Sequence, residues 1–158
     1  MLSVRLVRVV ERHADEVTHE VVRELQASPR TPAFHSLPAE ELRRRIHHLL
    51  RNLGQWVKER SQPKVAAFYE ELGRRRFHEG VPMSELAIAF ALIKRGVRSH
   101  VLASVAPASA VELYQLEEFE VLIDGFFDEA LYHTVKGWEA AVGGALQPVL
   151  AGSDRGGV

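Results

Sequence analysis

The sequence predicts an all-α protein, a five-helix bundle that is either globin-like or up-and-down and that ends in a long C-terminal helix. Apolar residues recur three and four positions apart along most of the 158 residues, the period of a helix with one buried face. Prolines and glycines separate these periodic stretches. No stretch alternates convincingly between apolar and polar residues, so we predict no strand.

The length of the chain fits a single domain that buries roughly 68–70% of the surface of its unfolded form. We place this helical domain at residues 1–142. We read residues 143–158 as a flexible tail or linker, because the apolar period is lost there. The chain has no cysteine, and no apolar run approaches the ~20 residues of a membrane span. We therefore expect a cytoplasmic protein that does not enter a membrane.

Three helices are predicted before the centre of the chain, over residues 4–27, from Pro38 to about residue 58, and over residues 63–79. The valines of the first helix leave an extended conformation open for residues 4–10. A loop over residues 28–37 follows the first helix, and Phe34 is expected to fold this loop onto the core.

The most apolar helix is predicted over residues 82–104, directly after a sharp turn at Gly80. Gly80 stands where a helix end needs a residue that tolerates positive φ, and Pro82 lies where the next helix starts. Apolar residues then cover two faces of the helix. Because such a helix is normally surrounded by others, we predict that it lies at the centre of the bundle.

A last helix is predicted from the capping-box pair Ser109 and Glu112 to about Val142. As a straight helix it would span about 50 Å, against a radius of gyration of about 15 Å for a compact domain of this size. Either Gly125 or Gly137 bends this helix, or its far end projects or pairs with a second copy. We predict a homodimer and a signal that passes along this helix, with four candidate contact residues: Phe126, Phe127, Leu131 and Trp138.

Charge is distributed unevenly, although the net charge is only −1. Residues 43–98 carry 13 Lys and Arg against 5 Asp and Glu, whereas residues 99–158 carry 2 against 9. The preferred explanation is that basic and acidic helices face each other or are solvated. A basic surface for nucleic acid, built from the arginines and lysines of residues 43–76, is the second alternative.

Motifs for catalysis are missing from the sequence. There is no phosphate-binding glycine loop, no serine nucleophile in a strained turn and no pair of carboxylates in a suitable setting, so we expect no enzyme. A single Glu-x-x-His motif, Glu16 to His19, does not suffice for a di-metal site, and we expect no metal. A haem-binding or small-molecule-binding sensor stays open as an alternative, with four candidate pocket residues: Tyr69, Phe77, Phe90 and His100.

The stretch LGRRRFHEGVPMSELAIAFALIKRGV resembles the N-terminal sensory domain of the RsbRD type, found in RsbT co-antagonist regulators and in some histidine kinases. The resemblance extends over about residues 10–140, but only residues 73–98 are distinctive. The residues that carry it are a Gly-Arg-x-Arg helix end and the turn that follows: Gly73, Arg74, Arg76, Gly80, Pro82, Ser84, Glu85 and Leu86.

The resemblance implies a non-catalytic input module of bacterial stress signalling, globin-like, without haem and dimeric. Such modules often precede a STAS or kinase output domain, so an output kinase or STAS-type protein is the partner that it implies. The chain departs from this pattern because it ends at Val158 without an output domain. We expect either a stand-alone regulator or part of a longer protein.

Overall fold

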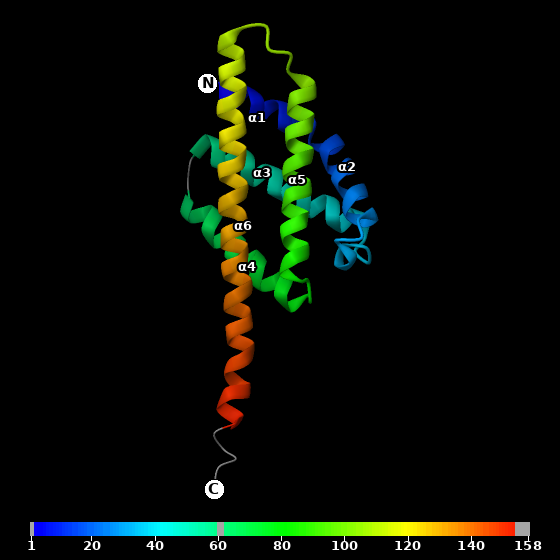
Figure 1. Cartoon of the computed structure of the whole chain (residues 1–158), viewed down its shortest axis with the longest axis vertical. Coiled ribbons are helices and arrows are strands. Elements are labelled where there is room, and N and C mark those ends of the chain that lie inside the picture. The colour runs from blue at the N-terminus through cyan, green and yellow to red at the C-terminus, as the bar shows by residue number, and fades with distance from the viewer. Residues whose placement is uncertain (1, 60–61, 154–158) are drawn as a thin grey trace.

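The computed structural model describes residues 2–59 and 62–153, and the chain in these ranges is all-α, as predicted (Figure 1). The described residues contain six α-helices, one short 3-10 helix and no strand. In chain order the elements are α1 (Leu2–Arg12), α2 (Ala14–Ala27), η1 (Pro32–Phe34), α3 (Ala39–Glu59), α4 (Gln62–His78), α5 (Met83–Ser104) and α6 (Ala110–Ser153). No helix in these two ranges combines the length and the apolar character needed to cross a membrane.

The first predicted helix is two helices, so the bundle has one helix more than expected. His13 interrupts it, with φ −101° and ψ 12°, and its carbonyl oxygen accepts the Val17 N–H of α2 at 3.0 Å. Residues 4–10 are helical and not extended. The break escapes the sequence pattern because the apolar stripe continues across it, with Val10 and Val17 both buried.

The loop between α2 and α3 folds onto the core as predicted, and Phe34 is 5% exposed. Two polar contacts hold the loop. The Thr31 hydroxyl donates to the Leu25 carbonyl at 2.7 Å, and the buried Glu85 carboxylate of α5 accepts the Ala33 N–H at 2.8 Å. The loop is therefore fixed to both α2 and α5.

The turn after α4 has the conformation that its sequence predicts. Gly80 has φ +77°, and its N–H donates to the Phe77 carbonyl while the Val81 N–H donates to the Arg76 carbonyl. These two bonds form a Schellman motif, which satisfies carbonyl groups at the end of α4. Pro82 is the N-cap of α5, so the helix begins at Met83, one position after the predicted start.

Replacing Gly80 by Val is expected to destabilise the protein by more than about 1 kcal/mol, whereas Pro82→Ala has a mild effect. A Cβ at Gly80 would meet no atom within 4 Å, so the cost comes from the positive φ alone. Urea unfolding of both variants measures the difference. Equal losses of unfolding free energy would contradict this view of the turn.

The most apolar helix, α5, is not the centre of the bundle, contrary to the prediction. It packs mainly on α1, α2 and α6, whereas α6 contacts α1, α3, α4 and α5. Leu86, Phe90 and Ile93 are buried on its inner face. Its second apolar face is covered only in part, since Ala91 and Leu102 are exposed. The helix that organises the fold is α6.

Helix α6 runs unbroken over 44 residues, about 66 Å at the ordinary rise of a helix. Its start is capped as predicted, with the Glu112 N–H donating to the Ser109 hydroxyl and the Glu112 carboxylate accepting the Ala108 N–H. Neither Gly125 nor Gly137 breaks the helix. Figure 1 shows instead that its C-terminal part, in orange and red, projects beyond the other helices.

Of residues 143–158, predicted to form a flexible tail or linker, residues 143–153 continue the helix α6. Residues 154–158 lie outside the described part of the chain. A helix tolerates Gly143 and Gly144 at about 1 kcal/mol each relative to Ala, so these glycines weaken the helix without ending it. The division of the chain into a domain and a linker stays a prediction.

The most extensive helix pair, α4 with α6, crosses at two glycines. A Cβ on Gly73 would overlap the backbone carbonyl of Thr134, and a Cβ on Gly137 would overlap the backbone carbonyl of Glu70. The two backbones are therefore in direct contact. Gly137 serves close approach between helices, and the predicted alternative that it bends α6 is wrong.

Candidate functional site

A cavity of about 210 Å³ lies between α3, α4 and α5, beneath the loop that carries Phe34. Its apolar wall is made of residues from α2, the loop and all three of these helices, among them Leu25, Phe34, Leu42, Ile46, Leu49, Tyr69, Leu72, Leu86, Phe90 and Ile93. Ligand sites are typically apolar cavities with a few converging polar groups. This cavity has that character, at a size that suits a small molecule.

Tyr69 is the largest fully buried side chain of the cavity wall. Its ring packs edge-on against Phe90 and Phe126, at centroid distances of 6.0 Å each. Burial raises the pKa of the Tyr69 phenol, and a weak interaction with the Asn52 amide opposes this shift. The hydroxyl faces Asn52 without completing a well-formed hydrogen bond, so a buried donor in this wall is left unsatisfied.

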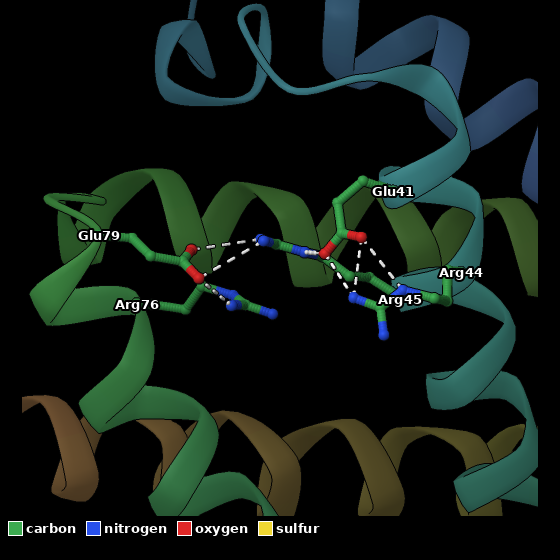
Figure 2. A network of polar contacts seen from close by, with 5 residues as sticks. All are labelled: Glu41, Arg44, Arg45, Arg76 and Glu79. Carbon is green, nitrogen blue, oxygen red and sulfur yellow. Dashed lines mark hydrogen bonds and ion pairs between the residues drawn. The ribbon is translucent and has the colours of Figure 1, made fainter.

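Charged residues of α3 and α4 line one side of the cavity. Figure 2 shows Glu41, Arg44, Arg45, Arg76 and Glu79 in a row between the two helices. Arg45 joins the two segments, because it donates to Glu41 at 2.9 Å on its own helix and reaches Glu79, the residue after the end of α4, at 3.3 Å. Arg76 donates to Glu79 at 2.9 Å.

The electrostatic balance of this row is positive, with three arginines against two carboxylates. Hydrogen bonds from Arg44 and Arg45 lower the pKa of Glu41 to about 2, so this carboxylate stays ionised. Arg76 is 7% exposed, and burial lowers the pKa of its guanidinium to about 10. His48, also in the cavity wall, has a pKa lowered by burial and then by Arg51, Arg75 and Arg44. This charged row, called the arginine lip below after Arg44, Arg45 and Arg76, therefore favours an anionic group at the side of the cavity that it lines.

The structure brings together only two of the four predicted pocket residues. Tyr69 and Phe90 line the cavity. Phe77 packs on Trp138 instead, with ring centroids 5.4 Å apart. His100 pairs with Glu16 at 3.0 Å, away from the cavity wall. Among the described residues His100 therefore does not join Tyr69 and Phe90, and haem binding stays an untested alternative.

Most of the residues predicted to contact a second copy instead pack or form hydrogen bonds inside the same chain. Phe126 and Phe127 are buried in its own core, so they are unavailable to a partner, and this prediction is wrong. The Trp138 indole N–H donates to the Val81 carbonyl at 3.1 Å, which fixes α6 to the turn after α4. Leu131 is half-buried beside a shallow groove between α5 and α6.

The motif residues of the sequence gather around the cavity and the turn. Arg76 and Leu86 line the cavity, and Glu85 holds the loop that supplies Phe34. Gly73 and Gly80 serve the close helix contact and the positive φ described above. Pro82 caps α5. Arg74 forms a surface pair with Glu71 at 3.6 Å, and Ser84 is exposed.

The basic residues of the middle of the chain are largely engaged by acids. On α3 and α4 the pairs are Arg43–Glu40, Arg44–Glu41 and Arg76–Glu79. The basic α5 faces the acidic α6, since Lys94 contacts Asp124 at 2.8 Å and Arg98 contacts Glu120 at 3.2 Å. These contacts favour the preferred explanation of the charge asymmetry over a surface for nucleic acid.

Sequence reasoning missed the cavity itself and its arginine lip. In the sequence these arginines are part of one basic stretch. In the fold, Arg44 and Arg45 of α3 and Arg76 of α4 come together at the same cavity.

Comparison with known proteins supports one assignment. No curated protein matches the chain, and no solved structure matches it either. The profile of the family described as "RsbT co-antagonist protein rsbRD N-terminal domain" matches residues 11–142, which is most of the chain. The match confirms the resemblance seen in residues 73–98. The chain belongs to this family of signalling regulatory domains.

Proposed function

We propose that the chain is a non-catalytic, cytoplasmic sensory domain of bacterial signal transduction that acts by pairing with a second copy along α6 and by contacting an output protein of the kinase or STAS type. The family supports a regulatory role. The observation that carries the proposal is an exposed apolar seam on α6.

The seam runs along the side of α6 that faces away from the core. Its clearest members are Val121, Tyr132 and Leu146, with 70%, 57% and 53% exposed surface. Half-buried Val135 and Val142 lie between Tyr132 and Leu146, at successive spacings of three, seven and four residues, and Val121 lies eleven residues before Tyr132. Apolar residues at this spacing form the contact stripe of paired helices.

A second copy of the chain is the occupant that this seam suits best. The core-facing side of α6 is already filled by Phe119, Ile123 and Phe126, so the seam is a second apolar stripe on the same helix. It continues onto the projecting end of α6, where none of the other helices in the described ranges 2–59 and 62–153 covers it (Figure 1). Two such stripes are self-complementary, as the contact of a symmetric dimer requires.

A movement of α4 can be transmitted to α6 through two contacts. The crossing at Gly73 and Gly137 leaves no space between the backbones of α4 and α6. The Trp138 indole joins α6 to the Val81 carbonyl after α4. Since α4 also forms part of the cavity wall, a ligand that displaces α4 must displace α6 or break this contact.

The double substitution Val142→Glu with Leu146→Glu is expected to convert a dimer into a monomer, because four negative charges would meet in the seam. The matched control is Ala140→Glu with Gln147→Glu, two exposed positions on the opposite side of the same helical segment. Light scattering at micromolar concentration measures the mass. Dimers of equal stability in both variants would overturn the proposal.

A second candidate function, favoured by the cavity, is the sensing of a small molecule with an apolar body and one acidic group. The apolar wall fits the body of such a ligand, and the arginine lip fits the acid. Carboxylates and phosphates share this recognition chemistry.

Binding of a medium-chain fatty acid, measured by calorimetry, tests the second candidate. Arg45→Gln is expected to weaken binding at least ~10-fold through loss of a charged hydrogen bond. Arg43→Gln is the control, since Arg43 lies on the same helix outside the cavity wall. The alcohol of equal chain length tests the acidic group. Equal affinities for acid and alcohol, or equal losses in both variants, would contradict the candidate.

A further inference from the structure

Three metal-ligating side chains converge at the junction of α1 and α2. His13 stands in the junction, Glu16 follows on α2, and His100 comes from α5, 84 residues after Glu16. The Glu16 Oε2 atom lies 3.4 Å from His13 Nδ1 and 3.0 Å from His100 Nε2. The ligand atoms of all three residues lie within 4.8 Å of one another.

Two of the three separations match those around a tetrahedral ion. With bonds of about 2.0–2.2 Å to nitrogen and oxygen, two ligands of such an ion are roughly 3.3 Å apart. Both edges that include Glu16 already have nearly this length. The third edge joins the two imidazoles, whose centroids are 4.9 Å apart at an angle of 50°. The ligand atoms of the two rings lie within 4.8 Å of each other, so the binding of an ion requires this edge to shorten.

The chemistry of the donor set selects the ion. Two imidazole nitrogens and one carboxylate suit a borderline divalent transition metal, whereas Mg²⁺ and Ca²⁺ prefer oxygen ligands alone. Three protein ligands leave one position of a tetrahedral ion for water. Glu16 is 66% exposed while His100 is 19% exposed, so the site has a fixed inner side and an open outer side.

We propose that His13, Glu16 and His100 form a zinc-binding site that fastens the α1–α2 junction to α5. The junction is a place where the chain needs such a contact, because His13 has no side-chain capping bond. An ion that binds only the folded arrangement raises the stability of the protein by mass action. The site is separate from the cavity and from the seam of α6, so it stands or falls independently of the proposed function.

Titration of the tag-free, full-length chain with Zn²⁺ and with Co²⁺ tests this site. We expect one equivalent of Zn²⁺ to raise the melting temperature, and Co²⁺ to give the visible absorption of a four-coordinate site. Glu16→Gln, which keeps the shape of the side chain, and His100→Ala are each expected to weaken binding at least ~10-fold. His19→Ala is the matched control, an exposed histidine of α2 outside the cluster.

The proposal is overturned if Zn²⁺ shows no saturable binding below millimolar concentration. It is also overturned if Glu16→Gln and His100→Ala bind as tightly as the unmodified chain. Loss of binding in His19→Ala with retention in His100→Ala would move the ion to the Glu16-x-x-His19 motif and exclude the site described here. Should His100→Ala fail to fold, Glu16→Gln alone decides, since its side chain is largely exposed.

Discussion

Gly137→Ala is expected to destabilise the protein by at least about 3 kcal/mol, the upper range for overpacking in a core. The added methyl group would overlap the backbone carbonyl of Glu70. A backbone atom cannot rotate away as a side chain does, so α4 and α6 would have to separate. Gly73→Ala is expected to act similarly, through the carbonyl of Thr134. Urea denaturation followed by circular dichroism measures both.

Gly143→Ala is the control for this prediction. Gly143 lies in the same helix, and a Cβ there would meet no atom within 4 Å. Its replacement is expected to leave stability unchanged or to raise it by about 0.5–1 kcal/mol, because Ala is the better helix former. A small effect at Gly137, similar to that at Gly143, would mean that α4 and α6 are not in backbone contact.

Glu79→Ala is expected to destabilise the protein by about 2 kcal/mol, whereas Arg76→Met costs clearly less. The first change leaves the buried Arg76 guanidinium without its partner at 2.9 Å. The second change removes the charge together with the cost of burying it, and Met retains much of the apolar stem. Because Glu79 is 40% exposed, the loss stays below that of a fully buried pair.

The comparison of the two single variants with Glu79→Ala/Arg76→Met checks this explanation. The double variant is expected to be more stable than Glu79→Ala alone, since no unpaired charge remains. Additive losses from the two substitutions would show that the ion pair does not determine the stability of this part of the fold.

Features that depend on neighbours in the chain could be predicted from the sequence. The Gly80 turn is fixed by Gly80 itself and by hydrogen bonds that reach back at most five residues. The cap at Ser109 is equally local. The bounds of α3, α4 and α5 follow from their apolar period and from the prolines at their starts. Local steric and hydrogen-bonding rules are sufficient for these elements.

Features that depend on distant parts of the chain could not be predicted. Gly73 and Gly137 meet backbone atoms more than sixty positions away in the chain, and the sequence shows each only as a glycine within a helix. The break at His13 leaves the apolar stripe intact. Of the four candidate pocket residues, Tyr69 and Phe90 lie in the wall of one cavity, whereas Phe77 and His100 do not. Which side chains line a cavity depends on how the helices cross. The apolar period of the sequence gives no information on these crossings.

The prediction of a dimer rests on the excess length of the last helix, but the residues named as its contacts include buried ones. The excess length of the last helix is real, and the helix is longer than expected. Phe126 and Phe127 suggest a contact with a second copy because the large apolar residues of this helix spread over more than one face, but both are buried in its own core. The seam of smaller residues, Val121 and Val142 among them, becomes visible only when the core side of α6 is known.

The mass of the purified chain under native conditions tests the central claim most directly. Native mass spectrometry at micromolar concentration is predicted to give a species of about 35 kDa, twice the 17.7 kDa of one chain. The same spectrum reports any small molecule retained in the cavity. A single species at 17.7 kDa would contradict pairing along α6.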